Sequence, residues 1–283
     1  MQFFLLILLS GTIRGIGYIV SKYISLGKGS AHAMALANAI MDTLITLPIG
    51  LVYLAQNPTN PEIMVLLLAI VSAGMYGLCV AFQYAALKRI DMSVMGIILR
   101  LNILFTSLIG VIVLREQMNG WNYLGLLAIL SGNFAVVYKK GKFDLNQGVI
   151  FAILAAICSA LASIMDKQVL NSINSIFYVS LNSLLIMLTM LLMKPKAMTE
   201  SVMLIKNRFR IFFLYSCIIV TAWFIGSYVL QNMDVSKFTP IQKSVTLIIP
   251  VLSGILIFKE KQNLRQKMIG LGFAIIGIAL MYL

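Results

Sequence analysis

The basic residues of this chain are confined almost entirely to alternate gaps between long apolar segments. Of its 22 lysines and arginines, only Arg14, Arg100 and Lys243 lie inside an apolar segment. Short cytoplasmic loops of membrane proteins carry an excess of Lys and Arg. The alternation therefore predicts a chain that crosses a bilayer many times in one fixed orientation.

The composition excludes a fold that is mostly exposed to water. Of the 283 residues, 60% are hydrophobic and only 11% are charged, whereas soluble domains average about 25% charged residues. The net charge of +13 does not indicate nucleic-acid binding, because the basic residues sit in short loops and form no continuous stripe. We expect the chain to be surrounded by the lipid bilayer and to bind no nucleic acid.

The apolar segments are long enough to cross a membrane as helices, which requires about 20 residues each. Turn sequences such as Asn57-Pro58 and Lys194-Pro195 separate several of them. The first segment has no basic leader and no small-residue cleavage site, so we expect a retained span. The ten predicted spans are residues 2–21, 33–55, 63–87, 93–114, 121–138, 148–165, 174–193, 210–232, 237–258 and 267–283.

The gaps between these spans predict the topology. In one set of alternate gaps, the only basic residues are Arg115, Lys167 and Lys237. The basic gaps contain Lys22 and Lys28; Lys88 and Arg89; Lys139, Lys140 and Lys142; Lys194, Lys196, Lys206, Arg208 and Arg210; Lys259, Lys261, Arg265 and Lys267. The basic gaps should face the cytoplasm. With ten spans in a plasma (inner) membrane, both termini are then predicted outside.

The two halves of the sequence resemble each other at an offset of about 144 residues. Residues 114–119 (LREQMN) match residues 258–263 (FKEKQN), and residues 91–93 (DMS) match residues 234–236 (DVS). Five spans in each half force the second half to insert upside down. We therefore predict an all-α membrane protein with ten transmembrane helices in two inverted five-helix repeats, residues 1–140 and 147–283. Such repeats form many secondary transporters, whose substrate site lies near the midplane.

The ten-span plan, the repeat and the acidic motif that closes the fourth and ninth spans resemble the drug/metabolite transporter superfamily, in its EamA-like branch. The motif continues as Asn-Gly-Trp-Asn-Tyr-Leu-Gly in the first half, and Tyr84-Ala85-Ala86-Leu87 precedes the fourth span. Many members carry a Trp-Gly pair in the first span, where this chain has Arg14-Gly15. The resemblance implies a carrier of small organic metabolites, with export as the common direction.

The three intramembrane cations are the main candidates for substrate binding, because a cation at bilayer depth usually faces a cavity or a partner. Arg100 and Lys243 occupy corresponding repeat positions, so they should converge from opposite halves. Together with Arg14 they suit a carboxylate or phosphate group. The alternative is that Asp42 and Asp166, the coupling or counter-ion candidates, neutralise them within the structure.

Polar and aromatic side chains inside the spans complete the predicted site. Tyr76 and Gln83 lie seven positions apart and share a helix face. Amides inside a bilayer either bind a ligand or join helices, and Trp223 either lines a cavity or packs between helices. The remaining predicted substrate-binding residues are Asn38, Asn102, Asn182, Trp223 and Gln242.

The acidic residues of the repeated motif, Glu116 and Glu260, are interpreted as helix-end clamps rather than as catalytic groups. Small residues should mark close helix contacts, among them Gly11, Gly272 and Gly277. The three cysteines form no CxxC pair. No nucleotide, metal or nucleophile motif appears, so we expect no enzyme, no cofactor and no metal.

These observations predict a secondary transporter of a small metabolite that works by alternating access. The substrate is expected to be anionic or zwitterionic, such as an amino acid or another carboxylate, and to be exported. One alternative is a carrier of cationic amines or drugs. The other, from a different class, is a non-transporting membrane subunit or a lipid-linked-sugar translocase. Whether the chain acts as a monomer or a homodimer is left open.

Overall fold

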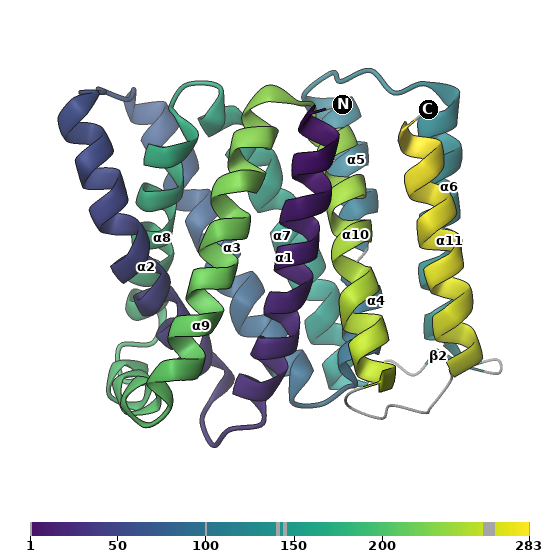
Figure 1. Ribbon diagram of the computed structural model, residues 1–283, viewed down its shortest axis with the longest axis horizontal. Helices are drawn as coiled ribbons and strands as arrows, with labels where there is room; N and C mark the ends of the chain where they lie inside the picture. Colours follow the sequence, from purple (N-terminus) through teal and green to yellow (C-terminus); the bar gives the residue numbers. More distant parts are fainter. Residues whose placement is uncertain (1, 100, 140–141, 144–145, 257–263, 283) are drawn as a thin grey trace.

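The computed structural model describes residues 2–99, 101–139, 142–143, 146–256 and 264–282 and is almost entirely helical. The helices lie alongside one another and run between two ends of the molecule (Figure 1). They are α1 Gln2–Ser25, α2 Ala31–Gln56, α3 Ile63–Leu87, α4 Met92–Ile98, α5 Leu101–Val113, α6 Gly120–Val137, α7 Gln147–Leu170, α8 Ser175–Met193, α9 Ala197–Asn232, α10 Val235–Leu256 and α11 Leu264–Tyr282. An all-helical membrane fold is thus confirmed.

Both termini lie at one end of the molecule, together with residues 57–62, 114–119 and 171–174 (Figure 1). We call this the terminal end. The opposite end, called the basic end, holds residues 26–30 and 88–91 and the loop between the halves.

A small hairpin joins the two halves at the basic end. Its strands, β1 Tyr138–Lys139 and β2 Lys142–Phe143, pair antiparallel with Tyr138 opposite Phe143 and Lys139 opposite Lys142. The first helix of the second half, α7, follows this hairpin, whereas α1 begins at the terminal end (Figure 1). The first helices of the two halves therefore run in opposite directions.

In the part of the chain that the structure describes, eight helical segments are long and apolar enough to cross a bilayer. They are α1, α2, α3, residues 94–113 across α4 and α5, α7, α8, α9 and α11. The helices α6 and α10 lie alongside them (Figure 1). A multi-pass membrane protein is confirmed. The count of ten spans stays a prediction, because it requires α6 and α10 to cross the membrane as well.

Two predicted spans differ from the helices observed. The span predicted at 93–114 consists of α4 and α5, with Leu99 in a turn between them. The span predicted at 210–232 is the second part of α9, which has 36 residues and a kink at Arg208, where φ is −137° and ψ is 35°. The kink separates residues 197–207 from the rest of the helix.

The segment before this kink is tied to the N-terminus of α2. The carboxylate of Glu200 accepts hydrogen bonds from the backbone N–H of Ser30 at 2.6 Å and from its hydroxyl at 2.7 Å. The hydroxyl of Ser201 donates to the carbonyl of Ala33 at 3.0 Å. These long-range bonds hold residues 197–207 at the basic end, which hydropathy by itself does not predict.

The helix contacts have the pattern expected of two related halves. In the repeat, α1 corresponds to α7, α2 to α8, α3 to α9, α4–α5 to α10, and α6 to α11. If each helix is replaced by its counterpart, the contact between α3 and α7 becomes the contact between α9 and α1, and both contacts are present. In the same way, the contact between α2 and α9 corresponds to the contact between α8 and α3. The contacts of α2 with α8 and of α6 with α11 each correspond to themselves. This exchange supports the predicted repeat.

Small residues allow some of these helices to approach closely. A Cβ on Gly11 would lie 3.0 Å from the carbonyl oxygen of Gln242 in α10. A Cβ on Gly277 would lie 2.7 Å from the carbonyl oxygen of Gly125, where α11 meets α6. The prediction was wrong for Gly272, because a Cβ there would meet open space.

Candidate functional site

A cavity of about 110 Å³ lies among α1, α2, α3, α7, α8, α9 and α10. It extends toward the basic end, because its lining includes Asn38 near the start of α2 and Gln83 and Met190 near the ends of α3 and α8. We call it the basic-side cavity. The predicted site residues that line it are Arg14, Asn38, Asp42, Tyr76, Gln83, Trp223 and Lys243.

A second cavity, of about 30 Å³, extends toward the terminal end. Its lining includes Leu230 near the end of α9 and Phe238 near the start of α10, and we call it the terminal-side cavity. The predicted site residues that line it are Arg14, Tyr76, Asp166, Trp223, Gln242 and Lys243. Arg14, Tyr76, Trp223 and Lys243 line both cavities.

Two charged groups of the basic-side cavity have buried atoms that no hydrogen bond satisfies. They are Nε of Arg14 and Oδ1 of Asp42. Within the described residues, Arg14 forms no ion pair with Asp42. The third charge, Lys243, has its Nζ 3.4 Å from Oγ of Ser159 and further polar interactions. Unsatisfied buried polar atoms are costly, so these groups are candidates for contact with a ligand or with water.

Asp166, in contrast, has a full set of hydrogen bonds. Its Oδ2 accepts from the hydroxyl of Tyr76 at 2.7 Å, and its Oδ1 accepts from the hydroxyls of Ser72 and Tyr178. The side chain is only 3% exposed. Three hydroxyl donors from α3 and α8 suit a group that can act only as an acceptor, as an ionised carboxylate does.

The predicted amides have different environments. Gln242 lines the terminal-side cavity, and its Nε2 donates to the hydroxyl of Ser10 at 3.1 Å. Asn102 and Asn182 line neither cavity. The Nδ2 of Asn182 donates to the hydroxyl of Tyr178 at 2.8 Å within α8, and the Nδ2 of Asn102 donates to the carbonyl of Ala156 in α7 at 3.5 Å. The contact of Asn102 with α7 matches the alternative in which such amides join helices, whereas the bond of Asn182 stays within its own helix.

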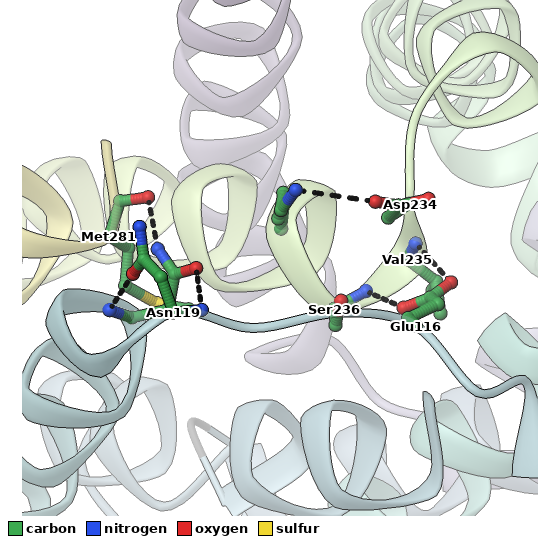
Figure 2. A network of polar contacts seen from close by, with 8 residues as sticks. Glu116, Asn119, Asp234, Val235, Ser236 and Met281 are labelled. Atoms are coloured by element: carbon green, nitrogen blue, oxygen red, sulfur yellow. Dashed lines mark hydrogen bonds and ion pairs between the residues drawn. The ribbon is translucent and has the colours of Figure 1, made fainter. Parts of the chain in front are cut away.

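Glu116 lies at the terminal end, away from both cavities, and contacts α10 of the other half. Its Oε1 accepts the backbone N–H of Val235 at 2.9 Å, and its Oε2 accepts that of Ser236 at 2.8 Å (Figure 2). These N–H groups have no partner within α10, and its N-terminus attracts negative charge. The preceding Arg115 has a positive φ of 55°, a left-handed conformation that is common just after the C-terminus of a helix.

The same region joins the last helices of the two halves. Asn119 and Asn122 exchange side-chain and backbone hydrogen bonds at 3.0 and 2.8 Å and so cap α6. The Nδ2 of Asn122 also donates to the carbonyl of Met281 at 3.0 Å, near the end of α11 (Figure 2). In the first half, the motif therefore caps α6 and α10 and contacts the end of α11. The predicted residues Arg100 and Glu260 lie outside the described residues.

Sequence reasoning missed three polar residues of the basic-side cavity, Tyr18, Tyr215 and Ser159. Tyr18 follows Arg14 by four positions, and Tyr215 precedes Trp223 by eight. Helical periodicity places residues three to four or seven to eight positions apart on one face. The spacing from Arg14 and from Trp223 could therefore have identified Tyr18 and Tyr215 from the sequence.

The model of the EamA-like transporter family matches the chain twice, over residues 2–138 and 146–283. The chain belongs to the EamA-like transporter family. The two matches cover nearly the whole sequence, one in each half, and the resemblance to the drug/metabolite transporter superfamily is confirmed. The protein is therefore a multi-pass membrane transporter, and family membership indicates transport rather than catalysis.

Solved structures support the fold. One crystal structure matches with a TM-score of 0.62 at 15% sequence identity, over 97% of this chain and 95% of that chain. At this identity the likeness concerns the fold alone. No curated protein matches the sequence.

Proposed function

We propose that this transporter moves a small zwitterionic or anionic solute, such as an amino acid or another carboxylate, across the plasma membrane by alternating access. The observation that carries the proposal is the set of charges around the basic-side cavity. Arg14 and Lys243 line it together with Asp42, and Arg14 and Asp42 each have a buried atom without a hydrogen-bond partner. A substrate carboxylate would accept from the two cations, and a substrate ammonium would donate to Asp42.

The size of the cavity favours a small solute. The basic-side cavity has a volume of about 110 Å³. Pockets for drug-sized ligands measure about 300–1,000 Å³. A short amino acid or carboxylate is therefore a better candidate than a drug or a lipid-linked sugar.

The arrangement of the two cavities supports alternating access. They extend toward opposite ends of the molecule and share Arg14, Tyr76, Trp223 and Lys243. A solute bound at these shared residues would be reached from either side when one cavity widens and the other narrows. We propose export because it is the common direction in the drug/metabolite transporter superfamily.

The test is a thermal-shift screen of the purified protein with an amino acid, a monocarboxylate and a primary amine of similar size. A ligand at 100 times its Kd stabilises the folded protein by about 2.7 kcal/mol. We expect the amino acid to raise the Tm most, the carboxylate less and the amine least. Selective stabilisation by the amine would favour the alternative of an amine carrier.

Matched variants connect the shift to the cavity. Arg14→Ala and Lys243→Ala should abolish the shift by the carboxylate while the unliganded protein stays folded. Lys237→Ala is the control, because this lysine of α10 forms a surface ion pair with Asp234 at 3.4 Å and lines neither cavity. If Lys237→Ala reduces the shift as much as Lys243→Ala, the binding site lies elsewhere.

A further inference from the structure

Two aromatic rings meet where the two cavities adjoin. Tyr76 of α3 and Trp223 of α9 both line the basic-side and the terminal-side cavities. Their ring centroids lie 6.2 Å apart, with an angle of 65° between the planes. This edge-to-face geometry is favourable for aromatic pairs, so the two rings form a stable contact across the path that joins the cavities.

A hydrogen bond to Asp166 also fixes the side chain of Tyr76. Its hydroxyl donates to Oδ2 of Asp166 at 2.7 Å, and Asp166 is itself fixed by hydroxyls from Ser72 and Tyr178. The carboxylate belongs to α7, in the second half, whereas Tyr76 belongs to the first. Moving the ring of Tyr76 away from Trp223 therefore requires breaking a hydrogen bond between the two halves.

We propose that Tyr76 and Trp223 form a gate between the two cavities and that Asp166 holds this gate closed through the hydroxyl of Tyr76. The proposal rests on the transport function proposed above and adds to it the residues that block the path. The Tyr76 ring swings aside only after its hydroxyl leaves Asp166, and the terminal-side cavity then joins the basic-side cavity. Arg14 and Lys243 line both cavities at this position, so the substrate's charged group would lie beside the gate.

Another aromatic pair of the protein offers a matched control. Phe82 of α3 and Phe151 of α7 stack with centroids 5.9 Å apart, and neither residue lines the basic-side or the terminal-side cavity. This pair also joins a helix of each half. A change of Phe82 therefore removes a comparable ring contact from the same helix as Tyr76 without opening the proposed path.

The experiment measures access from each side of the membrane without any substrate. A single reporter cysteine is placed in the basic-side cavity by Ala39→Cys or in the terminal-side cavity by Ser227→Cys. The native cysteines Cys79, Cys158 and Cys217 are first replaced by serine or alanine. Right-side-out and everted vesicles are then labelled with a membrane-impermeant methanethiosulfonate that carries a sulfonate.

With the gate intact, each reporter should react from the side toward which its cavity extends. Trp223→Ala should raise the rate at which the Ala39→Cys reporter reacts from the opposite side by up to about tenfold, because an aromatic pair of this kind shifts an equilibrium by up to roughly that factor. Tyr76→Phe keeps the ring but removes the hydroxyl, so a smaller rise is expected. Phe82→Ala should leave the rate unchanged.

Equal rates in Trp223→Ala and Phe82→Ala would overturn the gate. If Tyr76→Phe, which preserves the ring and its packing, shows no rise, Asp166 does not hold the gate. The labelling requires no substrate, so a failure of the gate leaves the substrate class untouched. Conversely, a thermal-shift screen in which no carboxylate binds would reject the substrate class and leave the labelling result intact.

Discussion

Oε2 of Glu116 lies 2.8 Å from the backbone nitrogen of Ser236 and so connects the end of α5 to the start of α10. Oε1 of the same carboxylate accepts the N–H of Val235 at 2.9 Å. The sequence predicts Glu116 to be a clamp at the end of its own span. In the structure it caps a helix of the other half, which explains why an acidic residue follows the span.

Glu116→Gln should lower the free energy of unfolding by about 1–2 kcal/mol, because the amide keeps one oxygen acceptor and loses the charge that favours a helix N-terminus. The measurement is the thermal unfolding midpoint in detergent. Glu62→Gln is the control, since Glu62 precedes α3 at the same end without a side-chain capping bond. Equal Tm values for the two variants would contradict the capping role.

Glu260→Gln should lower the Tm in the same way. The motif around Glu260 corresponds to that around Glu116, and Asp91-Met92-Ser93 corresponds to Asp234-Val235-Ser236. If the two motifs have the same role, loss of the charge of Glu260 should destabilise the protein as loss of the charge of Glu116 does. The same unfolding measurement checks this expectation. A Tm unchanged from that of the native protein would count against equivalent roles for the two motifs.

Gly277→Ala should destabilise the protein by about 1–3 kcal/mol, the usual range when extra atoms are forced into a packed contact. The added Cβ would lie 2.4 Å from Cγ1 of Ile129 and 2.7 Å from the carbonyl oxygen of Gly125. Gly272→Ala on the same helix is the control, because a Cβ there meets open space. It should be neutral or slightly stabilising, since alanine favours a helix over glycine. If denaturant unfolding gives the reverse order, α6 and α11 do not pack as described.

Asn38→Ala and Asn182→Ala should have different effects although the two residues correspond in the repeat. Asn38 lines the basic-side cavity and donates to the hydroxyl of Tyr84, so its loss should weaken ligand binding. Asn182 is buried outside both cavities, so its loss should cost roughly 0.6 kcal/mol of stability and leave the ligand Kd unchanged. Ligand titration and unfolding of both variants check this. An equal change of Kd in both would contradict the proposed site.

The topology prediction is that both termini face outside and that residues 139–142 face the cytoplasm. A cysteine introduced in this loop should resist an impermeant reagent in intact cells and react in everted vesicles. A C-terminal reporter that is active only outside the cytoplasm should be active. Rapid labelling of the loop in intact cells would reverse the assigned orientation.

Much of the architecture follows from sequence because local properties determine it. Hydropathy and length predict the helices, because a helix must be long and apolar enough to cross the bilayer. The positions of Lys and Arg predict which loops share an end, because basic loops remain on the cytoplasmic side. The match of residues 114–119 with 258–263 indicates the repeat. The heptad spacing of Tyr76 and Gln83 also places both residues correctly on one face of α3.

Only the tertiary structure decides which polar groups meet, because that depends on how helices distant in sequence rotate against one another. Asn38 and Asn182 look equivalent in sequence, yet one lines a cavity and the other bonds to Tyr178. The hydroxyls that surround Asp166 come from α3 and α8, and no spacing along α7 indicates them. The sequence by itself determined the helices, their membrane setting and the family. The packing between the halves decided the cavities, the contact of Tyr76 with Trp223 and the partner of Glu116.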